Sequence, residues 1–156
     1  MLIATGCLAG YMESHKLSMR VDRLEAFLRF LSSARAEIRY SSMPVGSILR
    51  SHGNGIAFLS CIEPDCCGKA WLEQWNHAVE KHAESEGFGK KDLDLLKDFG
   101  AGFGNSDTES QLAHFDLYEN LTSSALENAR SDRDRKSRLY LMLGVLGGTA
   151  AAILLC

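Results

Sequence analysis

The feature that most constrains this chain is its C-terminal end, where eighteen consecutive residues carry no charged side chain. Residues 139–156 read LYLMLGVLGGTAAAILLC. As a helix rising about 1.5 Å per residue, this segment is roughly 27 Å long, close to the thickness of the hydrocarbon layer of a membrane. The segment therefore predicts a C-terminal transmembrane helix, with a buried helix of a soluble protein as the alternative.

A basic stretch precedes this segment and sets its expected orientation. It contains Arg130, Arg133, Arg135, Lys136 and Arg138, balanced only by Asp132 and Asp134. Because segments rich in lysine and arginine next to a membrane helix stay in the cytoplasm, we expect the chain before Leu139 on the cytoplasmic side.

The N-terminal end is also apolar but shorter. Residues 1–12 read MLIATGCLAGYM, and their helix would be roughly 18 Å long, too short to span a bilayer alone. Lys16, Arg20 and Arg23 follow the apolar run rather than precede it. This order argues against a cleaved signal peptide and directs the continuation into the cytoplasm. We assign residues 1–15 to a short N-terminal membrane segment, with a peripheral hydrophobic anchor as the alternative.

Both ends carry glycines four residues apart. Gly6 and Gly10 lie in one end, and Gly144 and Gly148 lie in the other. Faces of small residues let two helices approach closely in lipid. We expect the two segments to pack as a helical hairpin, unless the glycines reflect only the ordinary abundance of this residue in membrane helices.

Residues 16–138, between the two ends, have the composition and periodicity of an all-α domain. The whole chain has only two prolines, and helix-forming residues recur. Apolar side chains three and four residues apart predict an amphipathic helix between residues 17 and 38. These side chains are Leu17, Val21, Leu24, Leu28, Leu31 and Ile38.

Breaks in the apolar pattern divide the rest of this domain into shorter helices. Pro44 suits the first turn of a helix that ends near Arg50, because its missing N–H would be unpaired there in any case. Further helices are expected at about 56–62, 69–85 and 93–99, separated by segments rich in glycine or proline. The predicted fold is a bundle of about six helices flanked by the two membrane helices.

The last helix of the domain is expected to follow a cluster of glycines. Gly100, Gly102 and Gly104 predict a helix stop and a tight turn. Ser106-Asp-Thr-Glu109 then has the pattern of a capping box at a helix start. The expected inner stripe of this helix is Leu112, Phe115, Leu117, Leu121, Ala125, Leu126 and Ala129. No proline or glycine interrupts it before Leu139, so it should run directly into the membrane segment.

The charge balance and the cysteines exclude several classes of function. With 17 basic and 20 acidic residues, the chain lacks the basic excess typical of nucleic-acid-binding domains. Cys61, Cys66 and Cys67 are not completed to a tetrahedral metal set by a second cysteine pair or paired histidines. His77 and His82 lie five residues apart and do not share a helix face well. We therefore expect no metal site.

Nothing in the chain forms a recognisable catalytic constellation. The glycines at 100, 102 and 104 lack the preceding strand and the lysine of a phosphate-binding loop. His114 lies beside the expected inner stripe and is interpreted as a surface histidine, with a pH-sensitive contact as the alternative. We expect no catalytic residue and no cofactor, and so a protein that is not an enzyme.

Two stretches of the chain resemble the stage III sporulation protein AB family of spore-forming bacteria. They are KKDLDLLKDFGAGFGNSDTESQLAHFDLY at 90–118 and LGVLGGTAAAILL at 143–155. Upstream, Leu31, Glu37, Ile38, Tyr40, Pro44, Ile48 and Leu49 fit the same family. The chain departs from it at Phe103, where leucine is usual, and in its shorter N-terminal segment.

The resemblance implies a location and a function. The family has a cytoplasmic helical bundle between two membrane segments, similar to the F-protein domain of type II secretion and type IV pilus systems. It implies a non-enzymatic structural or coupling component of the channel complex between mother cell and forespore. The expected place is the outer forespore membrane, with the helical domain in the mother-cell cytoplasm.

The resemblance also implies partners. These are a cytoplasmic ATPase resembling stage III sporulation protein AA, other membrane proteins of the same operon, and membrane lipid, but no nucleic acid. The candidate docking residues are the most specific block of the resemblance, namely Phe99, Gly100, Gly104, Ser106, Asp107 and Gln111, together with the exposed side of the helix that follows. The alternative function is a membrane-anchored helical adaptor that binds a soluble regulatory partner.

The predicted hairpin of the two ends is testable by disulfide cross-linking. A cysteine introduced next to Gly148 should form an oxidative cross-link with Cys7 in membranes, because the small-residue faces would bring the two helices together. The cross-linked chain is detected by its changed mobility in a non-reducing gel. Absence of the product, under conditions in which a control pair elsewhere cross-links efficiently, would contradict the pairing.

Overall fold

The computed structural model describes residues 2–41, 45–63, 69–83, 85–103 and 107–154. Every regular element in these ranges is helical, which confirms the all-α prediction. The elements are α1 (Leu2–Ser41), α2 (Val45–His52), the 3₁₀ turn η1 (Gly53–Gly55), α3 (Ala57–Ser60), α4 (Lys69–Ala78), the π-helical turn η2 (Val79–Ala83), α5 (Lys90–Gly102) and α6 (Thr108–Leu154). The shorter helices α2 to α5 match the expected helices to within a few residues.

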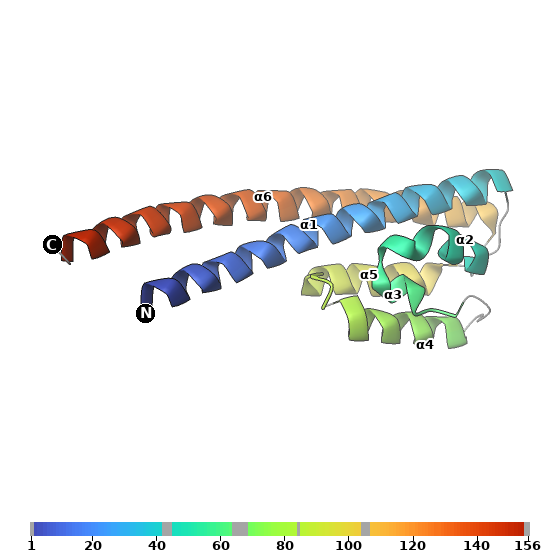
Figure 1. Ribbon diagram of the computed structural model, residues 1–156. Helices are drawn as coiled ribbons and strands as arrows, with labels where there is room; N and C mark the ends of the chain where they lie inside the picture. Colours follow the sequence, from blue (N-terminus) through green and yellow to red (C-terminus); the bar gives the residue numbers. More distant parts are fainter. Residues whose placement is uncertain (1, 42–44, 64–68, 84, 104–106, 155–156) are drawn as a thin grey trace.

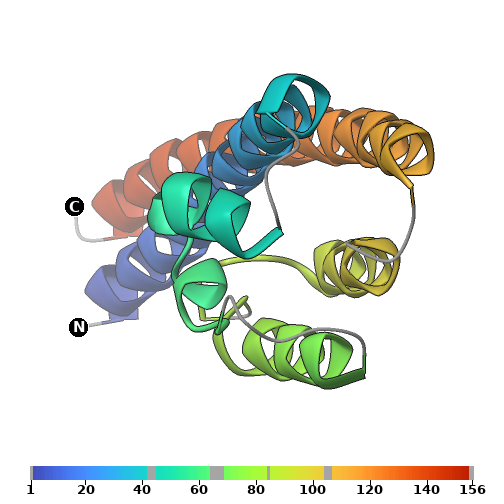
Figure 2. The same cartoon turned by 90° about the vertical axis from the view of Figure 1, so that its right-hand side faces the viewer.

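The architecture is a long antiparallel pair of helices with a compact group of short helices packed at one end (Figure 1). Helices α1 and α6 lie side by side, and their free ends extend together beyond α2 to α5. Viewed along the pair, from the end opposite the chain termini, α2 to α5 cover one side of it (Figure 2). The chain therefore begins and ends at the same end of the molecule.

Helix α1 is longer than the expected amphipathic helix. It runs without a break from Leu2 to Ser41 and joins the predicted N-terminal segment to the helix expected at 17–38. Its inner face is made of residues three or four apart that are almost fully buried, namely Val21, Leu24, Phe27, Leu31, Ala34 and Ile38. Helix α6 likewise passes Leu139 without a break, as expected.

The membrane predictions fall largely outside the side chains that the structure describes. Among the described residues, no helix carries an apolar stretch long enough to cross a membrane. Almost all side chains of 1–15 and 139–156 lie outside the described set, including Gly6, Gly10, Gly144 and Gly148. The two membrane segments and their pairing stay predictions.

The turn between η2 and α5 requires a glycine. Gly87 has a φ of 99°, a left-handed conformation that side chains other than glycine rarely adopt. A Cβ atom here would also lie 3.0 Å from the Cβ of Met19 on α1. This close approach brings the start of α5 onto α1.

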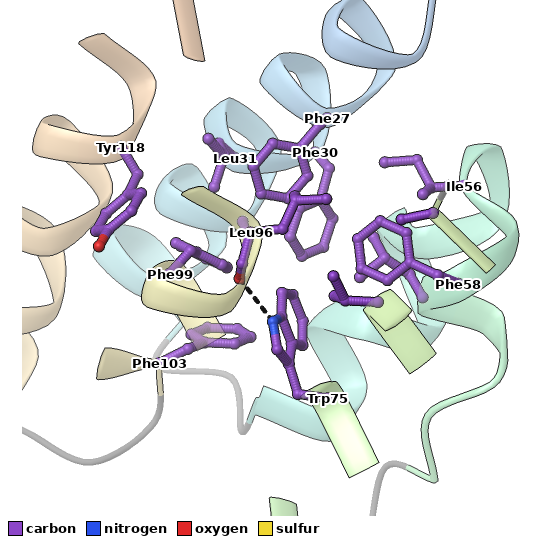
Figure 3. Close-up of a cluster of buried hydrophobic side chains, with 14 of the residues drawn as sticks. Phe27, Phe30, Leu31, Ile56, Phe58, Trp75, Leu96, Phe99, Phe103 and Tyr118 are labelled. Carbon is purple, nitrogen blue, oxygen red and sulfur yellow. Dashed lines mark hydrogen bonds between the residues drawn. The ribbon is translucent and has the colours of Figure 1, made fainter. Parts of the chain in front are cut away.

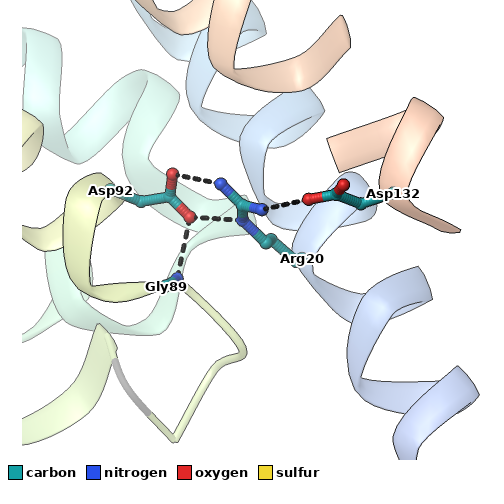
Figure 4. A network of polar contacts seen from close by, with 4 residues as sticks. All are labelled: Arg20, Gly89, Asp92 and Asp132. Carbon is teal, nitrogen blue, oxygen red and sulfur yellow. Dashed lines mark hydrogen bonds and ion pairs between the residues drawn. The ribbon is translucent and has the colours of Figure 1, made fainter. Parts of the chain in front are cut away.

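A buried ion pair fastens this start of α5 to the long helices. Asp92 accepts two hydrogen bonds from Arg20 on α1, with Nε–Oδ2 and Nη2–Oδ1 distances of 2.7 and 2.9 Å, and one from the backbone N–H of Gly89 at 2.7 Å (Figure 4). The Asp92 side chain is 2% exposed. Asp132 on α6 lies 3.9 Å from Arg20, so one guanidinium joins three helices.

The pKa of Arg20 is raised above its ordinary value, chiefly by its hydrogen bond to Asp92 and against the effect of burial. Two further arginines form ion pairs between α1 and α6. Arg35 pairs with both Asp116 and Glu119, at 2.6 and 2.7 Å, and Arg130 pairs with Glu25 at 2.5 Å.

The Arg20–Asp92 pair should contribute strongly to stability. Arg20→Met should lower the free energy of unfolding by about 3 kcal/mol, because it leaves a buried carboxylate without its cation. Adding Asp92→Asn should recover part of the loss, because the amide needs no counter-charge. The exposed Arg29, changed to Met, should cost less than about 0.5 kcal/mol. Denaturation followed by tryptophan fluorescence checks all three variants, and equal effects of Arg20→Met and Arg29→Met would contradict the assignment.

A candidate docking corner

The end of α5 and the start of α6 form a corner that lies far from the chain ends (Figure 1). We call residues 99–121 the docking corner, because they include the candidate docking residues and the first turns of α6. Behind it lies a cluster of rings that are all less than 2% exposed, contributed by α1, α3, α4, α5 and α6. Figure 3 shows Phe27, Phe58, Trp75, Phe99 and Phe103 in this cluster.

Side chains from neighbouring helices complete the hydrogen bonding at the C-terminal end of α5. The last four carbonyls of a helix have no partner within it. The carbonyl of Gly100 accepts a bond from Trp71 Nε1 at 3.2 Å, and that of Gly102 accepts one from Gln111 Nε2 at 3.2 Å. These donors close the end of α5 against α4 and α6.

His114 supplies a third such bond. Its Nε2 lies 3.0 Å from the carbonyl oxygen of Phe99, and a carbonyl can only accept, so Nε2 carries the proton. The ring is stacked on Phe99 with centroids 5.3 Å apart and contacts Tyr118 at 4.6 Å. The interpretation of His114 as an ordinary surface histidine is wrong, because the residue packs against the end of α5.

Two of the three glycines serve close packing rather than a turn. Helix α5 ends within the cluster, at Gly102, as predicted, but Gly100 and Gly102 are both part of the helix. A Cβ at Gly100 would lie 2.1 Å from Cδ1 of Trp75, and one at Gly102 would lie 2.3 Å from Cε1 of His114. The prediction that these two glycines form the turn itself is wrong, and Gly104 lies outside the described residues.

The Asp107 side chain caps the start of helix α6. The helix begins at Thr108, and the Asp107 carboxylate accepts bonds from the Ser110 hydroxyl at 2.7 Å and the Ser110 N–H at 3.2 Å. These bonds, the hydroxyl first, lower the pKa of Asp107. The side chain is exposed and charged at neutral pH. Ser106 lies outside the described residues.

The predicted docking residues thus divide into two groups. Phe99, Gly100 and Gln111 are buried, so they shape the corner from inside. Asp107 is exposed, and among the described members of the set it alone is available for direct contact. Docking by the corner stays a prediction, and its contacts fall to Asp107 and to the outer side of α6.

Two leucines of α6 are not where the periodicity placed them. Leu117 is 53% and Leu121 is 44% exposed, so their assignment to the inner stripe is wrong. The inner face includes Phe115, Leu126 and Ala129, as predicted, and in addition Gln111, Tyr118 and Thr122. The two leucines are misplaced by the apolar pattern because this sequence has buried polar residues, Gln111 and Thr122, at inner positions and leucines outside. The signal for this shift is the regular spacing of 111, 115, 118 and 122.

The described residues contain no group of three or more potential metal ligands. Cys61 is exposed, with its Sγ 3.7 Å from Nε2 of His82, while Cys66 and Cys67 lie outside the described residues. Glu80, on the same turn, pairs with Lys97 at 2.8 Å. The predictions of no metal and no cofactor stay untested.

A comparison with protein families now connects this architecture to a biological process. The model of the stage III sporulation protein AB family matches residues 1–156, the whole chain. The chain belongs to this family. No curated protein and no solved structure matches it significantly. The chain therefore has a role in stage III of sporulation.

The close packing at Gly100 is testable by a single methyl group. Gly100→Ala should improve helix propensity by about 1 kcal/mol, but the methyl group would overlap the fully buried Trp75, whose Nε1 is fixed at 2.7 Å from the Leu96 carbonyl. Overpacking costs about 1–3 kcal/mol, and a contact of 2.1 Å with a fixed ring belongs to the upper part of this range, so we expect a net loss of about 1–2 kcal/mol. Tryptophan fluorescence in a urea titration measures it. Gly55→Ala is the control, because a Cβ at that position has no neighbour within 4 Å. If the Gly100→Ala variant is as stable as the Gly55→Ala variant, the packing argument is wrong.

Proposed function

We propose that this protein is a non-enzymatic structural and coupling component of the channel complex between mother cell and forespore. The observation that carries the proposal is membership of the stage III sporulation protein AB family over the whole chain. The architecture supports it, because the chain ends leave the molecule together and the docking corner lies far from them.

The proposed attachment is to a membrane through the two chain ends. Helix α6 has 47 residues and is thus about 70 Å long, so it can reach from the bundle to a bilayer and into it. The basic residues of 130–138 precede its uncharged part, which favours a cytoplasmic bundle. We place the protein in the outer forespore membrane, with its bundle on the mother-cell side.

The proposed partners are a cytoplasmic ATPase resembling stage III sporulation protein AA and other membrane proteins encoded with it. Two long helices that carry a rigid bundle away from a membrane suit a scaffold that holds a soluble partner at a fixed place. The proposed similarity of the bundle to the F-protein domain of secretion systems would make it a platform for that ATPase.

The polar groups of the corner support a role without catalysis. Trp71, Gln111 and His114 are each bonded to a backbone carbonyl of α5, so these groups stabilise the fold. Rings packed on both faces of this end of α5 leave a rigid shape, which suits recognition better than chemistry.

The docking role is testable at Asp107. Asp107→Asn keeps an N-cap acceptor but removes the charge, and it should reduce co-purification of the ATPase about tenfold, corresponding to about 1.4 kcal/mol. The unfolding midpoint should stay unchanged. Pull-down of the ATPase from sporulating cells with the tagged full-length chain measures the effect.

Two further variants separate docking from stability. Gln111→Ala removes a buried bond and should lower stability by about 1 kcal/mol, whereas exposed Glu73→Gln on α4 should change neither property. Unaltered ATPase recovery with Asp107→Asn would reject the corner as the docking site. Capture of a different soluble regulator in place of the ATPase would favour the adaptor alternative.

A further inference from the structure

The outer side of α6 carries two exposed leucines next to α5. Leu117 follows His114 by three residues and Leu121 follows it by seven, so all three lie on one stripe of the helix. His114 itself contacts Gly102 and Phe99 of α5. The leucines, 53% and 44% exposed, therefore lie on the same side of α6 as the histidine that contacts α5.

The paired helix α1 does not cover these leucines. At the level of these leucines, the side chains of α6 that bond to α1 are Asp116 and Glu119. On a helix of 3.6 residues per turn, these two lie on a face that is more than a quarter-turn away from Leu117 and Leu121. The leucines thus remain uncovered by the elements that the structure describes.

Helix α5 carries two exposed acidic side chains, Asp94 and Asp98, at the level of this part of α6. Asp98 is close enough to Tyr118 to add to the effect of burial, the larger cause, in raising the pKa of that phenol. Helices α5 and α6 are antiparallel, since Gly102 meets His114 and Phe99 meets Tyr118. Asp94, one turn before Asp98, is therefore at the level of Leu121. We call Asp94, Asp98, Leu117 and Leu121 the α5–α6 strip.

The two carboxylates are available to a partner. Asp94 and Asp98 are both exposed, and neither pairs with a cation among the residues that the structure describes. Lys91, three residues before Asp94, is basic, so the exposed negative charge on this part of α5 is limited to Asp94 and Asp98. The strip thus combines an apolar centre with a negative border.

We propose that the α5–α6 strip binds an amphipathic helix of a partner protein that presents apolar residues to Leu117 and Leu121 and lysine or arginine to Asp94 and Asp98. The two leucines lie one turn apart, the spacing at which a facing helix offers its own apolar side chains. Complementary charge at the border selects a cationic helix over an acidic one. This inference deepens the proposed docking role and rests on it.

Photo-cross-linking in cells tests the proposal. The full-length chain with p-benzoylphenylalanine in place of Leu121 is expressed in sporulating cells, and the cross-linked peptide is identified by mass spectrometry. We expect a peptide from another protein whose sequence has helical apolar periodicity and basic flanking residues. The same probe at exposed Glu73 of α4 is the control and should not capture that peptide.

Charge reversal then tests the border. Asp94→Lys with Asp98→Lys should reduce the cross-link about tenfold, equivalent to about 1.4 kcal/mol, and changing the basic residues of the captured segment to glutamate should restore it. Both aspartates are exposed, so the unfolding midpoint should be preserved. A cross-link insensitive to the reversal would overturn the assigned chemistry.

Other products at Leu121 overturn the proposal as well. These are lipid, a second copy of this chain, an acidic segment, or no adduct. If any of them is found while Asp107→Asn still impairs ATPase recovery, the strip is rejected and the docking role stands. If the ATPase does not co-purify with the unaltered chain, the docking role itself fails.

Discussion

The closure of the C-terminal end of α5 is the constraint on which the docking corner depends. The carbonyls of Phe99, Gly100 and Gly102 are satisfied by side chains of α4 and α6 rather than by α5 itself. An unsatisfied buried carbonyl costs about 1–3 kcal/mol, so the three bonds fix where both neighbouring helices can lie. The glycines permit this approach, because a methyl group at Gly100 or Gly102 would overlap the ring that packs there.

The other end of α5 is fixed by charge. Arg20 and Asp92 hold it to α1 close to the place where α1 and α6 leave the short helices. Because α5 is held at both ends, the corner cannot shift relative to the long helices without breaking either the ion pair or the carbonyl bonds. A rigid α5 thus links the orientation of the corner to the pair of helices that leads to the chain ends.

The sequence allowed the helical class, most of the short helices and the continuity of α6 to be predicted, because these depend on periodicity and on breaks within a few residues. The placement of Leu117 and Leu121 could not be predicted in the same way. Apolar residues fit more than one stripe of α6, and the choice is decided by Gln111 and His114, whose bonds to α5 turn the helix. Such bonds join residues nine and fifteen positions apart in sequence, and their only local trace is the regular spacing of the buried positions 111, 115, 118 and 122.

The family resemblance and the proposed partner recognition depend on different residues of the docking corner. The most specific block of the resemblance includes Phe99, Gly100 and Gln111, which are buried, so these residues identify how α5 ends and how α6 packs on it. Buried residues cannot select among partners except through the shape they hold. In the proposed docking role, selection therefore falls to exposed groups on that shape, and the α5–α6 strip would add to Asp107 the apolar area that a charge alone cannot supply. Because hot spots of binding are well-packed anchors with charges around them, a partner should lose more affinity from changes at Leu117 and Leu121 than from neutralising a single carboxylate.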